Sequence, residues 1–113
     1  MMLTTEELGE VPNVEAAEMD DILASDGFGK FAILSVSEDV YLQAGNDWQP
    51  DEACRAFLLA HDSDPWVLEF REDDRQYQAT GRVTLDLVRQ AFRFYLSGGS
   101  EWRGGFTWSE LNL

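Results

Sequence analysis

The sequence holds a single cysteine, Cys54, a single histidine, His61, and a single lysine, Lys30. One cysteine excludes an intramolecular disulfide and favours a reducing compartment, so we expect a cytoplasmic protein. No apolar stretch approaches the roughly 20 residues that a membrane span requires. The first residues also lack the basic and apolar segments typical of a secretory signal. These absences argue against a secreted or membrane-embedded protein.

Positive charge is scarce as well. The chain has 8 Lys and Arg against 22 Asp and Glu, which gives a formal net charge of −14. A field of this sign repels nucleic-acid phosphates and anionic lipid surfaces, whereas it attracts basic proteins and speeds their encounter. We therefore expect a basic protein partner and neither nucleic acid nor membrane, although the same charge would also serve solubility alone.

No group of residues has the spacing of a catalytic or metal site. Cys54 and His61 are seven positions apart in one predicted helix, so about 10.5 Å of helix separates them and they form no thiolate–imidazole pair. They also fall short of the set of about four ligands that closes a zinc site. Asp62 and Asp64 begin a stretch like a calcium loop that lacks the turn glycine and the final glutamate. The sequence thus predicts no metal, no cofactor and no enzymatic activity.

The pattern of apolar residues predicts a single α+β domain over residues 1–113. Residues 30–46 and 66–80 each surround a polar turn with strand-forming residues, which predicts two hairpins and a four-stranded antiparallel sheet. The nearly continuous apolar run over residues 31–36 predicts a central strand that is covered on both faces. A short middle helix is predicted over 47–61 and a long C-terminal helix over 84–99, capped by Thr84.

Residues 1–29 carry eight acidic residues and no Lys or Arg. Thr4 and Glu7 match a capping box, and an apolar stripe follows over residues 14–24, so we expect an acidic N-terminal helical segment packed on the sheet. Its charge predicts that it lies against Arg89 and Arg93 of the last helix.

The stretch YLSGGSEWRGGFTWSEL, residues 95–111, combines two glycine pairs with two tryptophans. The first pair suits the end of a helix, and Phe106 and Trp108 suit an extended segment that packs back on the fold. A tryptophan buries about 150–250 Å², so we expect Trp102 and Trp108 to fasten the C-terminus. The alternative is a partly exposed aromatic patch for a partner.

The longer stretch from residue 83 to residue 111, VTLDLVRQAFRFYLSGGSEWRGGFTWSEL, resembles the C-terminal end of small immunity proteins of bacterial polymorphic-toxin systems. In that family an amphipathic helix is followed by Gly and by a Trp that closes the fold. The resemblance implies a small, cytoplasmic, acidic α+β protein that occludes a cognate toxin. It carries over no toxin-contacting residue.

The sequence therefore predicts a non-catalytic acidic protein-binding module, an immunity or inhibitor protein for a basic partner. The predicted partner-binding residues are Asp20, Asp21, Trp48, Glu72, Asp73, Asp74 and Trp102. Two alternatives remain open. One is a homodimer formed through a sheet edge or the Trp patch. The other is a small-molecule pocket between sheet and helix, with polar groups from Tyr41, Gln43, Gln76 and Gln78.

Overall fold

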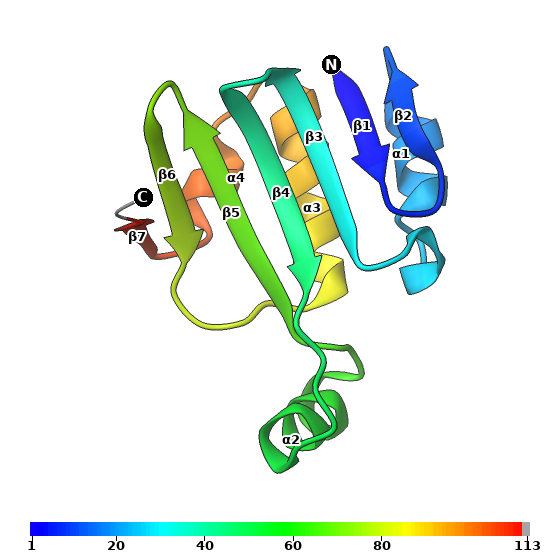
Figure 1. Ribbon diagram of the computed structural model, residues 1–113, viewed down its shortest axis with the longest axis vertical. Helices are drawn as coiled ribbons and strands as arrows, with labels where there is room; N and C mark the ends of the chain where they lie inside the picture. The colour runs from blue at the N-terminus through cyan, green and yellow to red at the C-terminus, as the bar shows by residue number, and fades with distance from the viewer. Residues whose placement is uncertain (112–113) are drawn as a thin grey trace.

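A seven-stranded antiparallel sheet forms one layer of the protein, in a computed structural model that describes residues 1–111 (Figure 1). The strand order is β2-β1-β3-β4-β5-β6-β7, so β1 lies between β2 and β3 and the later strands follow the chain as a meander. The strands are β1 (Met2–Thr5), β2 (Gly9–Pro12), β3 (Phe31–Ser37), β4 (Val40–Asn46), β5 (Trp66–Glu72), β6 (Arg75–Ala79) and β7 (Trp108–Leu111).

Helices cover one face of this sheet. The helices are α1 (Ala16–Ile22), α2 (Glu52–His61), α3 (Leu85–Leu96) and α4 (Glu101–Gly104), with a 3₁₀ turn η1 (Asp26–Phe28). In Figure 1, α1, α3 and α4 lie behind the sheet, whereas α2 lies beyond its lower end. Among the residues described, no helix has the length and apolar character needed to cross a membrane.

The core lies between the sheet and α3. Alternate residues of the central strands, such as Leu34, Leu42 and Leu68, are fully buried, as the period of two in a strand requires. They meet the buried stripe of α3, which contains Val88 and Phe92. Thr84 caps α3, because its side-chain oxygen accepts a hydrogen bond from the Leu87 N–H at 3.2 Å. The predicted hairpins and the long helix are thus present.

The predicted four-stranded sheet with three helices is wrong: the fold is α+β, but residues 1–111 form seven strands and four helices. The first error lies in residues 1–29, which open with two strands rather than a helix. Thr5 is buried and accepts a hydrogen bond from the Leu8 N–H in the turn between them. Leu3 pairs with Leu34 of β3, and this contact across 31 positions of the chain leaves no local pattern from which it could be predicted.

The second error lies at the C-terminus, where the expected extended segment is a seventh strand preceded by α4. Trp108 begins β7 opposite Ala79 of β6. Trp102 of α4 is only 5% exposed, and both tryptophan rings meet Phe70 edge-on, with centroids 4.9 and 4.8 Å away. The expectation that the two tryptophans fasten the C-terminus is confirmed.

The N-terminal segment also contacts the last long helix, as its charge predicted. Asp20 of α1 forms an ion pair of 3.2 Å with Arg93 of α3. Arg89 pairs instead with Asp86 of its own helix, at 4.0 Å.

Candidate functional site

The sheet face turned away from α1, α3 and α4 is covered by no helix within residues 1–111. Its outward side chains form three rows that run across the strands. The rows are Phe31–Gly45–Val67, Thr4–Ile33–Gln43–Glu69–Gln78 and Met2–Ser35–Tyr41–Arg71–Gln76. The predicted cover on both faces of residues 31–36 is therefore wrong, because Phe31 is 37% exposed and Ile33 is half-buried.

A hydrogen-bonded network occupies the β4–β6 part of this open face. The Glu69 carboxylate accepts hydrogen bonds from the side-chain amides of Gln43 and Gln76, the latter at 3.1 Å. The Tyr41 hydroxyl donates to Gln76 Oε1 at 3.2 Å. These polar groups were expected in a pocket between sheet and helix, but they lie on the opposite side of the sheet, and their bonds to one another hold them in place.

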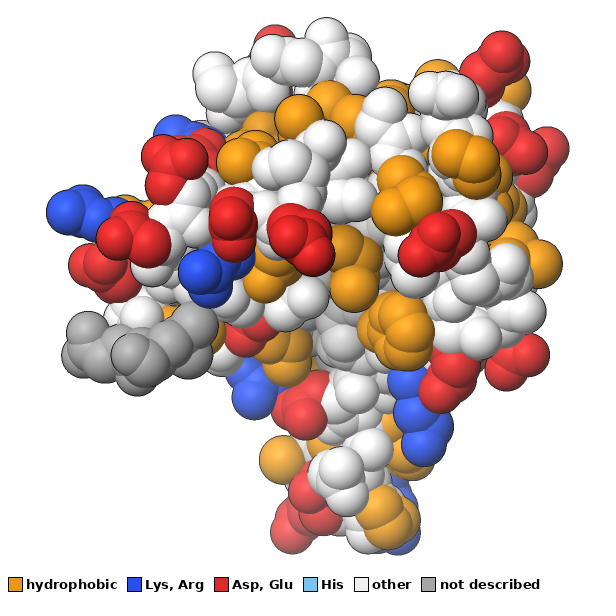
Figure 2. Space-filling view, turned by 45° about the horizontal axis from the view of Figure 1, so that its top comes forward, with side chains coloured by type: hydrophobic (Ala, Val, Ile, Leu, Met, Phe, Trp, Pro, Cys, Tyr) orange, Lys and Arg blue, Asp and Glu red, His pale blue; other side chains and the backbone are white. Residues whose placement is uncertain are grey.

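Two shallow hollows flank this network on the open face. One, of about 300 Å³, lies over Gly45 between Phe31 and Val67, with Glu69 at its side. The other, of about 550 Å³, lies between Met2, Ile33 and Tyr41 and the β3–β4 turn. Figure 2 shows hydrophobic side chains on this side of the molecule with acidic ones interspersed among them.

The predicted acidic residues lie at two separate places. Glu72 is the last residue of β5 and is paired with Arg103, and Asp73 and Asp74 form the β5–β6 turn. Asp20 and Asp21 lie on α1, behind the sheet. The structure therefore does not bring the five carboxylates together, and of the two groups only the turn adjoins the open face.

The two predicted tryptophan anchors have different surroundings. Trp48 lies half-buried in the segment that leads to α2, and its backbone N–H donates to the Asn46 side chain at 2.8 Å. Trp102 is packed on the helical side of the sheet, where Arg103 covers its ring at 5.0 Å. Its burial makes Trp102 unavailable as an exposed anchor.

In the connection between β4 and β5, residues 47–64 form an arm that carries α2 away from the sheet and its helices, which form the body of the molecule. Asp51 caps the helix by accepting a hydrogen bond from the Cys54 N–H at 2.8 Å, and Asp62 ends it in the left-handed conformation. This hydrogen bond lowers the pKa of Asp51 below its ordinary value. An ion pair of 2.6 Å between Asp47 and Arg82 ties the base of the arm to the body.

Cys54 and His61 have separate environments on α2. Cys54 Sγ accepts a hydrogen bond from the Gln49 N–H at 3.3 Å, which by itself lowers the thiol pKa, but burial and the Asp51 and Asp47 carboxylates raise the pKa overall. The His61 ring packs on Phe57, with centroids 4.5 Å apart. A buried thiol with a raised pKa has the character of a packing residue rather than a nucleophile.

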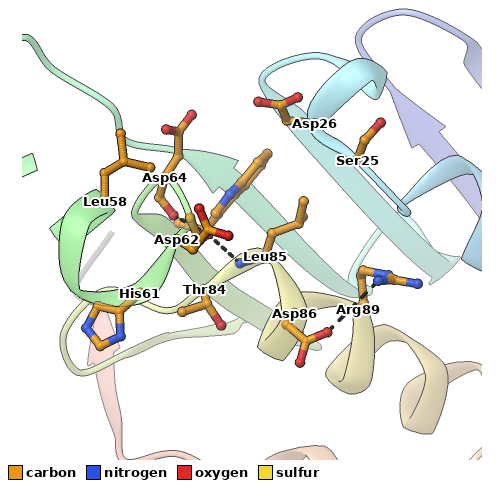
Figure 3. A pocket seen from close by; sticks show the side chains of 12 residues that line it. Ser25, Asp26, Leu58, His61, Asp62, Asp64, Thr84, Leu85, Asp86 and Arg89 are labelled. Carbon is orange, nitrogen blue, oxygen red and sulfur yellow. Dashed lines mark hydrogen bonds and ion pairs between the residues drawn. The ribbon is translucent and has the colours of Figure 1, made fainter. Parts of the chain in front are cut away.

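A hollow of about 550 Å³ is lined by the end of α2, by η1 and by the start of α3 (Figure 3). Its lining includes Leu58 of α2 and four carboxylates, from Asp26, Asp62, Asp64 and Asp86. Arg89 and His61 also line it. In the part of the chain that the structure describes, Arg89 Nε is buried without a hydrogen-bond partner.

Almost all arginines of this chain form ion pairs with its own carboxylates. Six of the seven form ion pairs with six different carboxylates. Six of 22 carboxylates are thus paired, and sixteen lie outside any ion pair within residues 1–111. The surface left for a partner is therefore strongly negative.

Sequence reasoning missed the open face and the arm. The available signals were the apolar residues Phe31 and Ile33 at outward positions of β3, and the adjacent Leu58 and Leu59 in a short helix. Both resemble core patterns, so only the structure shows that Ile33 is half-buried and that Phe31, Leu58 and Leu59 are exposed.

Neither a metal centre nor a known relative adds to this site. Across residues 1–111, no three or more His, Cys, Asp or Glu side chains are grouped so that they could hold a metal ion. In comparisons with protein-family models, curated proteins and solved structures, no match to this chain was found.

Proposed function

We propose that this chain is a non-catalytic acidic module that binds a basic protein on the open face of its sheet. The observation that carries the proposal is the group of apolar side chains within that face. Antiparallel sheets with one wet face ordinarily alternate apolar-in and polar-out. Here Met2 of β1, Phe31 and Ile33 of β3 and Val67 of β5 point outward, and apolar patches of this kind commonly mark interaction surfaces.

Charge supports a basic partner. Glu69 lies within the open face, and Asp73 and Asp74 lie in the turn at its end. With sixteen carboxylates outside any ion pair that the described residues form, long-range attraction would steer a basic protein to this surface. The rigid β-sheet then offers a preorganised contact, which lowers the entropic cost of binding.

The proposed role is inhibition, in which the module occludes the working surface of its partner. The resemblance of residues 83–111 to small immunity proteins of toxin systems supports this extension, and the partner would then be a basic toxin. We place the protein in the cytoplasm, because its one cysteine is unpaired and buried and fits a reducing compartment.

The test is affinity capture from a lysate of the source organism, with elution by a salt gradient and identification by mass spectrometry. The captured protein is then purified and titrated calorimetrically. Phe31→Gln removes an apolar contact from the open face. Phe94→Gln is the matched control, because Phe94 lies on α3 and is 41% exposed against 37% for Phe31.

We expect the capture to yield one basic protein that elutes with salt. This protein should bind Phe31→Gln about tenfold more weakly than the unmodified chain, as loss of a 1.4 kcal/mol contact implies. It should bind Phe94→Gln as tightly as the unmodified chain. Repeated captures that retain no basic protein would overturn the proposed function. Equal binding by both variants would overturn the assignment to the open face.

A further inference from the structure

The α2 arm is the part of the molecule whose exposed residues the fold does not explain. Leu59 is 88% exposed and Leu58 is 38% exposed. Within the described residues, α2 makes no extensive contact with another helix or strand, and Figures 1 and 2 show it as a narrow projection below the sheet. Two adjacent leucines at such a place contribute little to the stability of the fold.

The arm is nevertheless held in one shape. A helix of ten residues is marginal by itself in water, but α2 has a side-chain cap at its start and a left-handed residue, Asp62, at its end. The Asn46 amide donates to the Asp64 carboxylate at 2.9 Å and, with the Asp47–Arg82 ion pair, closes the base of the arm. These bonds preorganise the helix without burying its leucines.

The charge of the arm indicates what kind of partner it can bind. Residues 47–64 contain five acidic residues against one arginine, Arg55, and no lysine. The hollow beside Leu58 adds Asp26 and an ion pair between Asp86 and Arg89 from other elements, so carboxylates remain in excess there (Figure 3). A second copy of this chain would bring like charges together, which disfavours a contact between two arms. An apolar cleft with Arg or Lys at its rim complements both the leucines and the carboxylates.

We propose that α2 is a second docking element, which places Leu58 and Leu59 in an apolar cleft of a basic protein. Arg or Lys at the cleft rim then faces the carboxylates of the adjacent hollow. The inference rests on the proposed function, since it takes the same basic partner. It is carried by a different element, which lies beyond the end of the sheet rather than on its open face.

The experiment measures the affinity of the captured basic protein for four full-length variants by calorimetry, and its association rate at several salt concentrations by stopped-flow fluorescence. Leu59→Gln and Leu58→Gln replace an exposed apolar side chain with a polar one that still favours helix. Leu87→Gln is the control, because Leu87 lies on α3 and its 39% exposure matches the 38% of Leu58. Asp62→Asn removes one charge from the hollow and keeps a residue type that tolerates the left-handed conformation.

We expect Leu59→Gln to weaken binding about tenfold or more, because the variant lacks the leucine side chain that the partner would bury in the complex. Leu87→Gln should bind as tightly as the unmodified chain. Asp62→Asn should slow association and reduce its dependence on salt. Normal binding by Leu59→Gln, while Phe31→Gln is weakened, would overturn the docking role of α2 and leave the proposed function intact. Failure of the unmodified chain to bind any basic protein would overturn both.

Discussion

At the scale of single residues, Gly45 determines the shape of the open face. It lies between Phe31 and Val67 in one row of paired residues, and a Cβ built on Gly45 would meet nothing within 4 Å. The missing side chain therefore produces the hollow of about 300 Å³. Glu69 lies at its side, so the hollow suits the apolar stem and charged head of a lysine or arginine from the partner.

Filling this hollow should block binding without damage to the fold. In Gly45→Val, the new side chain occupies open space and has a high preference for strands, so the melting temperature should stay constant or rise. Binding of the basic partner should weaken about tenfold, as for loss of one well-packed side chain.

The control for this substitution is Gly104→Ala on α4, which also adds a side chain to open space. Its affinity for the partner should equal that of the unmodified chain. Calorimetric titration checks both variants, and tight binding by Gly45→Val would show that no partner side chain enters the hollow.

At the scale of elements, β1 is a structural strand although its residues form part of an acidic segment. It separates β2 from β3, and its Leu3 side chain is 0% exposed. The segment thus supplies both a strand of the sheet and, through Asp20, an ion pair with α3.

Leu3→Ala should therefore lower the free energy of unfolding by about 2–5 kcal/mol, the usual cost of truncating a fully buried leucine. Leu8→Ala, in the exposed turn after β1, should change it by less than about 0.5 kcal/mol. Urea denaturation measures both values. Equal stability of the two variants would contradict the position of β1 inside the sheet.

The α2 arm is an element whose order should depend on pH through its cap. The hydrogen bond from Cys54 N–H lowers the pKa of Asp51 below the ordinary 3.8. A depressed pKa in the folded state stabilises the cap fully above that ordinary value, and the contribution is lost as pH falls through the depressed pKa. The start of α2 should fray in acid while the sheet remains folded.

An NMR titration that follows the Cys54 amide between neutral and acid pH would measure this fraying. Asp51→Asn should keep the cap at every pH, because asparagine caps helices about as well as aspartate and does not titrate in this range. Asp51→Ala should fray α2 even at neutral pH. The same titration curve for Asp51→Asn and the unmodified chain would rule out Asp51 as the titrating group.

At the scale of the whole molecule, the excess of negative charge has no internal counterpart. Six of seven arginines are already paired, so the remaining carboxylates repel one another in the folded state. The same repulsion opposes the alternative of a homodimer. The two edge strands, β2 and β7, are only four residues long, and β2 contains Pro12, which are features that limit edge-to-edge pairing.

Added sodium chloride should therefore raise the melting temperature, because salt screens self-repulsion over a distance of about 10 Å at 0.1 M. Thermal unfolding followed by circular dichroism from low to moderate ionic strength checks the expectation. A melting temperature that falls with salt would show instead that the six ion pairs outweigh the repulsion.

Part of the fold followed from the sequence and part did not. The hairpins, α2 and α3 were predicted, since alternating residues such as Trp66, Leu68 and Phe70 and the cap at Thr84 act over a few positions. Residues 2–5 resemble the start of a helix because of the apparent capping box, but they form strand β1. The strand with which β1 pairs, β3, is far away in the chain, so the sequence nearby does not indicate it. Of the predicted anchors, Trp102 belongs to the core.

The sequence by itself determined the α+β class, the charge of the surface and most local elements, because composition, periodicity and capping are properties of neighbouring residues. Only the tertiary structure decided that β1 pairs with β3, that no helix of residues 1–111 covers one face of the sheet and that α2 projects away from the sheet. Whether Phe31 or Leu59 is core or contact surface depends on which distant segments cover it. That coverage is set by packing across the whole chain.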